Sequence, residues 1–291
     1  AQLDEGDIQS LRDFVGGFTA KELHPIFVGD EFRSKVTARN GISIETFYRI
    51  LAIDLLPKEL SRVMHLDVDL IVKGDILPFY EADITDRAFV VCEDIIGQIN
   101  GFHEANKYRM GIPAQYTYFN AGVMVLNLDL LREENAAGRM IERIYSDNAR
   151  YEYNDQDVMN EMYYDRLSVM GWDIYNCPPA WYFLDREALA TGRVEFAEYS
   201  RIQELSALTD GQARLSEKYI NMTEQIYDNA HIIHYMGDTK PWSTTRGDAA
   251  IFKIFDRAYE EARKKLSEEI LSELSVPASE AAKNGYYSRS E

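Results

Sequence analysis

The sequence is poor in cysteine and has no long hydrophobic run. Its 291 residues include two cysteines, Cys92 and Cys177, and two thiols so far apart make no disulfide scaffold. No stretch approaches the run of about 18 apolar residues that a membrane-spanning helix needs, and no signal peptide is visible. These absences argue against a disulfide-stapled secreted domain and an integral membrane protein, and we expect a cytoplasmic protein.

Positive charge is also scarce. Lysine and arginine number 31 against 49 aspartates and glutamates, which gives a net charge of −18. General nucleic-acid binders neutralise phosphates with clustered basic residues, so this balance argues against that class, and we expect no nucleic-acid partner. Any phosphate-bearing ligand must therefore meet local positive charge, supplied by a metal ion, a few basic side chains or a helix N-terminus.

What the chain does contain is an alternation of apolar stretches and helical patterns, which is typical of an α/β fold. We expect strands at residues 24–30, 64–72, 87–94, 118–128 and 231–236, and helices at residues 43–56, 128–148 and 153–165. The order predicts a mostly parallel sheet flanked by helices. We expect one domain over residues 1–247, a mixed-charge amphipathic helix over 248–274 and a disordered tail over 275–291.

Two acids interrupt the apolar run at residues 64–72, which otherwise suits a buried central strand. Side chains two apart in a strand share a face, so Asp67 and Asp69 would make half of a site for a hard divalent cation. If they serve only a metal, removing either charge should leave stability unchanged or slightly raised. The alternative is structural, in which the acids cap a helix or pair with a buried arginine.

A haloacid-dehalogenase-type phosphatase is a further alternative, since that class also carries Asp-x-Asp after an apolar strand. Two features count against it. Ile71 stands four residues after the first acid, where that class has Thr or Val, and no convincing downstream acidic pair completes its metal site.

A histidine and a loop near residue 234 extend the predicted site. Asp67, Asp69 and His234 form an O,O,N donor set, which suits Mn²⁺ better than Ca²⁺, with Mg²⁺ as a substitute. After His234, Gly237 allows a close backbone approach and Lys240 offers a point charge suited to phosphate. A lone histidine in an apolar strand is more often a core residue, and the loop is what favours the metal interpretation.

Four further polar residues stand at strand ends or a helix start. Turn chemistry could explain Asn120, strand termination could explain Asp94, and capping could explain Asp155, whereas Gln156 is less well explained that way. The functional interpretation of Asn120 is a side-chain amide at the rim of a cleft that hydrogen-bonds a polyhydroxylated ligand.

The order of these motifs resembles the family 8 glycosyltransferases, which are retaining enzymes with a GT-A fold and include bacterial lipopolysaccharide galactosyl- and glucosyltransferases and glycogenin. The series is Asp-x-Asp, "FNAGV", "NDQD" and "HYMGDTKPW", and the resemblance runs from about Leu3 to Trp242. It implies Mn²⁺-dependent transfer of a hexose from UDP-glucose or UDP-galactose to a glycan or glycolipid acceptor, in lipopolysaccharide or surface-glycan synthesis.

The resemblance also implies residue roles. The metal ligands would be Asp67, Asp69 and His234; the donor-binding residues would be Arg49, Asp94, Asn120, Gly237 and Lys240; and the catalytic residues would be Asp155 and Gln156. No residue is an obvious nucleophile, because Gln156 is neutral and Asp155 is the only acid in its motif. This favours attack on the same face of the sugar as the leaving phosphate. A non-catalytic sugar-nucleotide binder remains the alternative from another functional class.

The chain departs from the family at its start. The family opens with a strand and loop whose acidic and aromatic residues bind uracil and ribose, and Ala1 falls after that segment. We therefore expect the first strand of the sheet to be missing from this chain by trimming, and activity to need the segment restored. A lipid-linked acceptor would place the protein at the inner membrane face, with at most weak peripheral association, because the C-terminal helix is not strongly basic.

Overall fold

The structure is a computed structural model that describes residues 3–16, 22–29, 44–95, 102–179, 224–237, 240–242 and 250–265. Residues 36–260 form one compact unit, and residues 1–35 with 261–291 form another. In the second unit the described residues include helix α1 (Glu5–Gly16), which buries Ile8, and the segment 22–29. The strand expected at residues 24–30 is not formed over 22–29, where Phe27 is exposed.

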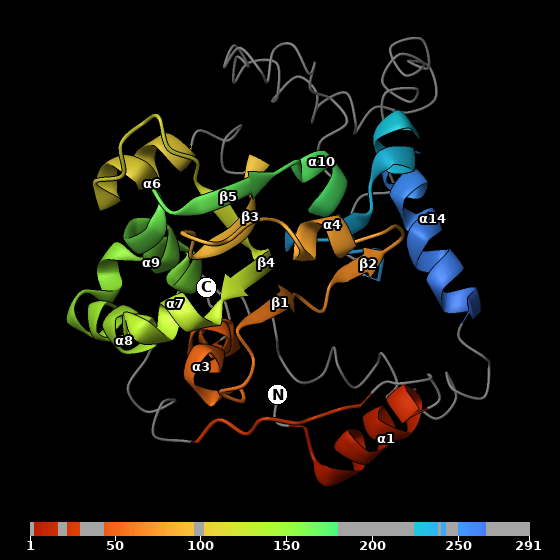
Figure 1. Cartoon of the computed structure of the whole chain (residues 1–291). Helices are drawn as coiled ribbons and strands as arrows, with labels where there is room; N and C mark the ends of the chain where they lie inside the picture. Colours follow the sequence, from red (N-terminus) through yellow and green to blue (C-terminus); the bar gives the residue numbers. More distant parts are fainter. Residues whose placement is uncertain are drawn as a thin grey trace, which may run out of the picture. The chain divides into compact units, whose positions relative to one another are not determined.

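A four-stranded sheet is the centre of the larger unit (Figure 1). Its order is β1 (Arg62–Leu66), β4 (Phe119–Asn127), β3 (Phe89–Glu93) and β5 (Leu167–Met170). Strands β1, β3 and β5 run in one direction, and β4 lies between β1 and β3 antiparallel to both. Three of the four strands are thus parallel in direction, as the prediction of a mostly parallel sheet implies. The sheet is nevertheless mixed, because β4 lies between β1 and β3 and makes two of the three ladders antiparallel.

The two central strands are buried on both faces, which explains their nearly continuous apolar sequences. On one face Val90 and Val125 belong to a cluster with Phe79 and Ile232. On the other face Phe89 packs edge-on against Tyr163, with ring centroids 5.4 Å apart. The sheet is thus covered on both sides, as an α/β fold requires.

The expected helices are present, with altered bounds. The first helix is η1 (Ile44–Phe47) followed by α3 (Tyr48–Leu55), and the last before β5 is α9 (Asn154–Tyr163). The helix expected at 128–148 is two, α7 (Leu128–Glu133) and α8 (Ala136–Ser146), because Asn135 takes the left-handed conformation with φ 50°. Shorter elements are α4 (Leu77–Tyr80), α6 (Phe102–Met110), η2 (Asn148–Arg150) and α10 (Trp172–Tyr175).

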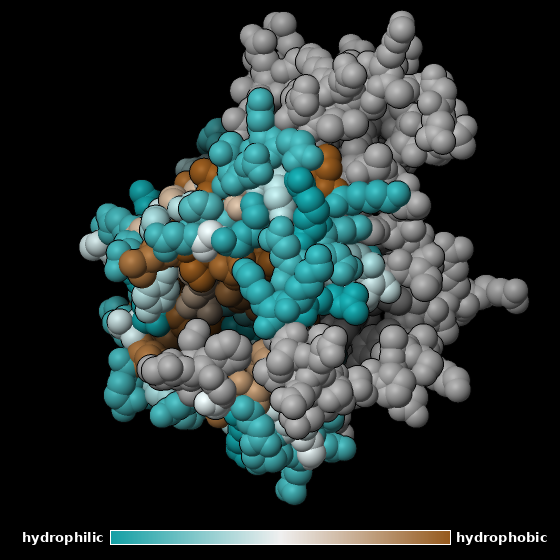
Figure 2. All heavy atoms as spheres, turned by 90° about the vertical axis from the view of Figure 1, so that its right-hand side faces the viewer, coloured by the Kyte–Doolittle hydropathy of each residue, from teal (hydrophilic) through white to brown (hydrophobic). Residues whose placement is uncertain are grey.

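The predicted C-terminal helix is described as α14 (Ala250–Lys265), and residues 266–291, including the expected tail, lie outside the described residues. Phe255 is buried and its carbonyl accepts a hydrogen bond of 2.6 Å from the Tyr235 hydroxyl. Trp242 lies between the rings of Tyr235 and Tyr259, with centroids 6.3 and 5.5 Å away. The described part of the surface that includes α14 is mainly hydrophilic, with hydrophobic side chains in a hollow (Figure 2).

The run at residues 64–72 is not the single buried strand that the sequence suggested. It forms β1 and then β2 (Leu70–Val72), which pairs antiparallel with β6 (Ile232–His234) in a separate two-stranded sheet. Between them the chain is irregular, and Val68 is fully exposed, not packed on the opposite layer. Two adjacent carboxylates are too costly to bury in a continuous strand, and the break leaves them half-buried.

Candidate functional site

The break between β1 and β2 is held by backbone hydrogen bonds from two other strands. The Asp67 N–H donates to the Gly122 carbonyl of β4 at 2.8 Å, and the Asp69 carbonyl accepts from the N–H of Tyr235, just after β6, at 2.8 Å. Three segments far apart in the sequence therefore meet at this point. The main chain of the loop that carries the acids is therefore hydrogen-bonded both to β4 and to the residue that follows β6.

The predicted convergence of two acids and a histidine is present. His234 Nε2 lies 3.1 Å from Asp69 Oδ1 and 3.8 Å from Asp67 Oδ2, and one ligand atom from each residue lies within 4.8 Å of the other two. His234 is buried at 2% exposure, while the acids are partly open. Two carboxylate oxygens and one imidazole nitrogen fit a divalent cation such as Mn²⁺.

A glycine makes room for this cluster. A Cβ built on Gly122 would lie 2.2 Å from His234 Cε1 and 2.8 Å from Asp67 Oδ2. No real side chain tolerates such distances, so the cluster fills the space that a larger residue at 122 would occupy. The glycine of the "FNAGV" motif is thus required by the site itself.

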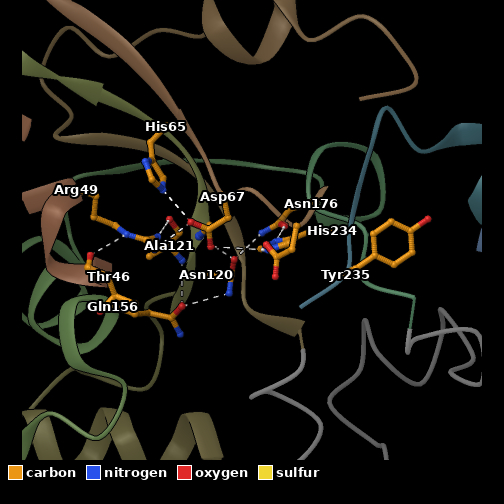
Figure 3. Close-up of polar contacts among 12 residues, drawn as sticks. Thr46, Arg49, His65, Asp67, Asn120, Ala121, Gln156, Asn176, His234 and Tyr235 are labelled. Atoms are coloured by element: carbon orange, nitrogen blue, oxygen red, sulfur yellow. Dashed lines mark hydrogen bonds and ion pairs between the residues drawn. The ribbon is translucent and has the colours of Figure 1, made fainter. Parts of the chain in front are cut away.

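Cations accompany both acids, as the structural alternative proposed. Asp67 Oδ1 lies 3.0 Å from Arg49 Nη2 and 3.0 Å from His65 Nε2 (Figure 3). Asp69 Oδ2 accepts a hydrogen bond of 2.6 Å from Lys240 Nζ. The metal-site and arginine-pairing interpretations are therefore compatible, because each acid has a cationic partner and also faces His234.

The pKa values of the two acids follow from these contacts. Burial alone would raise the pKa of Asp67, but the hydrogen bond with His65 and the charges of Arg49 and His234 outweigh it and lower that pKa. At Asp69 burial also acts to raise the pKa, and hydrogen bonds and charges from His234 and Lys240 outweigh it and lower the pKa. Both carboxyls are therefore held in the ionised form that a cation needs.

Asp155 contacts the same arginine as Asp67, but its pKa is shifted in the opposite direction. Its side chain is 5% exposed, and its Oδ2 lies 3.0 Å from Arg49 Nε. Burial raises the pKa of Asp155; the charge of Arg49 opposes this and the charge of Asp67 adds to it. Arg49 thus joins the predicted metal site to α9, because its guanidinium lies between Asp67 and Asp155.

A row of side-chain amides extends from His234 along the start of β4. His234 Nδ1 lies 2.8 Å from Asn176 Oδ1, and Asn176 Nδ2 donates to Asn120 Oδ1 at 3.0 Å. Asn120 Nδ2 donates to Gln156 Oε1 at 3.2 Å, and Gln156 Nε2 donates to Asp94 Oδ2 at 2.9 Å. The structure therefore brings Asn120, Gln156 and Asp94 together, as predicted, and adds Asn176.

Two residues of the predicted phosphate loop, Gly237 and Lys240, lie in the described residues, and Lys240 lies next to Asp69. Gly237 is exposed and has φ 61°, a conformation that favours glycine. Lys240 reaches back to Asp69 and also donates to the Tyr235 carbonyl at 3.1 Å. All ten predicted site residues thus fall in the described residues, with nine of them connected by the contacts above and Gly237 placed on the loop that carries Lys240.

Sequence reasoning missed His65, Gly122 and Asn176. His65 precedes Asp67 by two residues in the strand that the sequence predicted, and side-chain alternation there would have placed the two on one face. Asn176 carried no such signal, because it follows the short helix α10 and meets His234 only through the fold.

Opposite effects on stability are expected from the two acids that share Arg49. Asp67→Asn should lower the free energy of unfolding at pH 7, because a carboxyl with a lowered pKa stabilises the fold when ionised. Asp155→Asn should raise it, because a carboxyl with a raised pKa destabilises the fold when ionised. The pairing with Arg49 reverses our expectation that loss of the Asp67 charge would be neutral or stabilising.

Urea unfolding at several pH values measures both effects. The stabilisation by Asp67 is complete above its unfolded pKa near 3.8 and is lost as the pH falls toward the lowered folded value. The cost of Asp155 is present above its raised folded pKa and is gone below the unfolded value of 3.8. The difference in free energy of unfolding between each variant and wild type should therefore shrink near pH 3. Changes of the same sign in the two variants at pH 7 would contradict the opposite pKa shifts of Asp67 and Asp155.

Comparison with solved structures defines the class of fold. The galactosyltransferase LgtC, in complex with donor and acceptor sugar analogs, superposes with a TM-score of 0.62 at 19% identity, covering 91% of this chain and 87% of that chain. An active-site mutant of LgtC gives a TM-score of 0.64 at 18% identity, covering 97% of this chain and 86% of that one. The fold is therefore that of the GT-A glycosyltransferases.

Comparison of sequences defines the family. The sequence model of Glycosyl transferase family 8 matches residues 5–246, and the chain belongs to this family of glycosyltransferases. General stress protein A of Bacillus subtilis (strain 168) is 26% identical over 206 residues, or 70% of this chain and 60% of that protein. The lipopolysaccharide 1,2-glucosyltransferase of Escherichia coli (strain K12) is 27% identical over 198 residues, or 67% of this chain and 48% of that protein.

The chain spans about half the length of the curated relatives that it matches, with 44%, 60% and 48% of three of them covered. The family match favours the glycosyltransferase over the phosphatase interpretation. In the part of the chain that the structure describes, no helix is both long and apolar enough to cross a membrane.

Proposed function

We propose that this protein is a retaining, Mn²⁺-dependent hexosyltransferase that uses a UDP-sugar. The observation that supports this best is the convergence of Asp67, Asp69 and His234 beside Lys240 in a member of this family. These three side chains would hold the cation, for which Mg²⁺ could substitute. When bound, the cation neutralises charge on the departing UDP, and Lys240 on the Gly237 loop adds a point charge for the diphosphate.

The donor sugar would lie against the row of amides. Asn120, Gln156 and Asp94 offer donors and acceptors that are already oriented by one another, which suits the several hydroxyls of a hexose. Related lipopolysaccharide enzymes include a glucosyltransferase and a galactosyltransferase of Escherichia coli and Salmonella typhimurium, respectively. We therefore propose UDP-glucose or UDP-galactose as donor and a surface glycan or glycolipid, such as lipopolysaccharide, as acceptor. Such synthesis would be cytoplasmic, with the protein at most peripheral at the inner membrane face.

The burial of Asp155 supports attack on the same face of the sugar as the leaving phosphate. A double displacement would need a carboxylate open to the far side of the anomeric carbon, and Asp155 is 3% exposed and contacts Arg49. We propose that Asp155 acts by positioning Arg49 and that Gln156 orients the sugar. The acceptor hydroxyl would then pass its proton to the departing phosphate oxygen.

An assay of UDP release tests this proposal. The protein is incubated with UDP-glucose or UDP-galactose, with and without Mn²⁺. We expect slow Mn²⁺-dependent release from one donor through transfer to water, and NMR of the released sugar should show the retained anomer first. Binding of UDP without any release from either donor, with a glycan acceptor present, would instead identify a non-catalytic sugar-nucleotide binder.

Lys240→Ala should weaken UDP binding in the presence of Mn²⁺ by about 1.5–3 kcal/mol, the value of a charge-assisted hydrogen bond. It should not weaken binding of Mn²⁺ alone, because the lysine competes with the cation for Asp69. Lys240→Arg should rescue UDP binding only in part, since a planar fork does not reproduce a compact ammonium.

Calorimetric titration of UDP and of Mn²⁺ separates these effects. Lys58→Ala is a matched control, because Lys58 is exposed and its ammonium donates to the Asp54 carbonyl, at 3.4 Å, away from the candidate site. If Lys240→Ala and the control bind UDP equally well, the loop serves only to close the structure.

A further inference from the structure

Two consecutive backbone N–H groups at the start of β4 fix the orientation of the amide row. The Ala121 N–H donates to Gln156 Oε1 at 3.0 Å, and the Gly122 N–H donates to Asn120 Oδ1 at 3.0 Å. A backbone N–H can only donate, so the side-chain atoms opposite it must be oxygens. The amides of Gln156 and Asn120 therefore cannot be rotated to exchange their oxygen and nitrogen atoms.

The orientation of Asn120 determines that of Asn176, and Asn176 determines the proton position on His234. Asn120 Oδ1 is an acceptor, so the Asn176 atom 3.0 Å from it must be the donating nitrogen. The remaining Asn176 atom is an oxygen 2.8 Å from His234 Nδ1, so that nitrogen must carry a proton. Both side chains are nearly inaccessible, at 1% and 2% exposure, so water does not replace these bonds.

We propose that Asn176 is a positioning residue that holds a proton on Nδ1 of His234 and so fixes the tautomer of the ring. When the ring is neutral, this tautomer leaves the lone pair on Nε2, which faces Asp67 and Asp69 and is available to a divalent cation. The cation would otherwise have to displace a proton from Nε2, where the nearby Asp69 oxygen would favour it. A second partner that orients a metal-binding histidine in this way typically changes metal affinity by about 10–100-fold.

The backbone around Asn176 allows this side chain to be changed without moving the chain. The N–H of Cys177 donates to the Ile232 carbonyl at 3.0 Å, and the N–H of His234 donates to the Cys177 carbonyl at 2.9 Å. These bonds hold residue 176 beside β6 whatever its side chain. The effect of a substitution is therefore confined to the amide and its two partners.

The test compares Asn176→Leu, Asn176→Asp and Asn127→Leu in the whole protein. Leucine has the shape of asparagine but no polar atom, aspartate keeps an acceptor for His234 and loses the donor to Asn120, and Asn127 is a buried amide that contacts Ile84 and Arg87. Long-range ¹H–¹⁵N correlation spectra of the metal-free protein, at a pH where the imidazole is neutral, report the proton position. Calorimetry with Mn²⁺ alone reports affinity.

The wild type should show His234 protonated on Nδ1. Asn176→Leu should move the proton toward Nε2 and weaken Mn²⁺ binding about 10–100-fold. Asn176→Asp should keep both the proton position and the Mn²⁺ affinity, while Asn127→Leu should change neither. A wild-type ring protonated on Nε2, or an Asn176→Leu variant with wild-type affinity, would overturn the inference. This inference rests on the proposed metal site. Absence of Mn²⁺ binding by the wild type would refute the proposed function. The spectra of the metal-free protein would still test whether Asn176 fixes the proton on His234.

Discussion

Asp69→Asn is expected to abolish Mn²⁺-dependent transfer while the protein stays folded. Asp69 is the acid closest to His234, at 3.1 Å, and its other oxygen contacts Lys240. The substitution removes the charge that would bind the cation and the cation's share of stabilising UDP, which is worth several kcal/mol. We expect transfer to fall by a factor on the order of 10³, equivalent to about 4 kcal/mol in the barrier.

UDP release under saturating donor, with Mn²⁺ binding measured in parallel, checks this expectation. Asp54→Asn is the matched control, because Asp54 is an exposed acid on α3 that is not among the candidate site residues. The circular dichroism of both variants should match the wild type. Asp69→Asn with transfer within a factor of about three of the control would show that the acid serves only to pair with Lys240.

Gly122→Ala should remove metal binding although it replaces none of the three proposed metal ligands. Its Cβ would lie 2.2 Å from His234 Cε1, 2.8 Å from Asp67 Oδ2 and 3.0 Å from His234 Nδ1. His234 cannot move away freely, because it is buried and bonded to Asn176. We expect loss of detectable Mn²⁺ binding and transfer, and a stability cost of about 1–3 kcal/mol from overpacking.

Gly16→Ala is the control for this substitution, since no atom of the described residues lies within 4 Å of a Cβ at that position. It should leave Mn²⁺ binding and transfer unchanged. Calorimetry with Mn²⁺ and thermal unfolding of both variants decide the matter. Wild-type Mn²⁺ affinity in Gly122→Ala would mean that the ligands lie farther apart than the structure places them.

The α/β class and the residues that converge at the candidate site could be predicted from the sequence, because the motifs are local and their order is informative. Asp67, Asp69 and His234 converge as expected, although β2 and β6, not the expected central strand, bring His234 to the acids. The break at Val68 could not be predicted, because the apolar pattern continues through it. The apolar pattern shows which residues can be buried. Burying the charges of Asp67 and Asp69 would cost free energy, and this cost explains why the strand breaks between them.

The strand order of the sheet and the contacts that orient the proposed metal ligands also could not be predicted from the sequence. The alternation of strands and helices does not reveal that β4 enters between β1 and β3 in the opposite direction. The bond between Asn176 and His234 joins residues 58 positions apart with no motif around the asparagine. Such contacts depend on packing over the whole unit, and they fix details such as a proton position that a motif cannot specify.

Anomalous diffraction from crystals grown with Mn²⁺ and UDP is the most direct test of the central claim, that Asp67, Asp69 and His234 bind the cation that holds the donor diphosphate. We expect one strong manganese peak between the two carboxylates and His234 Nε2, with the diphosphate bound to it and Lys240 moved from Asp69 to a phosphate oxygen. A nucleotide bound with no manganese at these residues, or manganese bound elsewhere with Lys240 still on Asp69, would contradict the account.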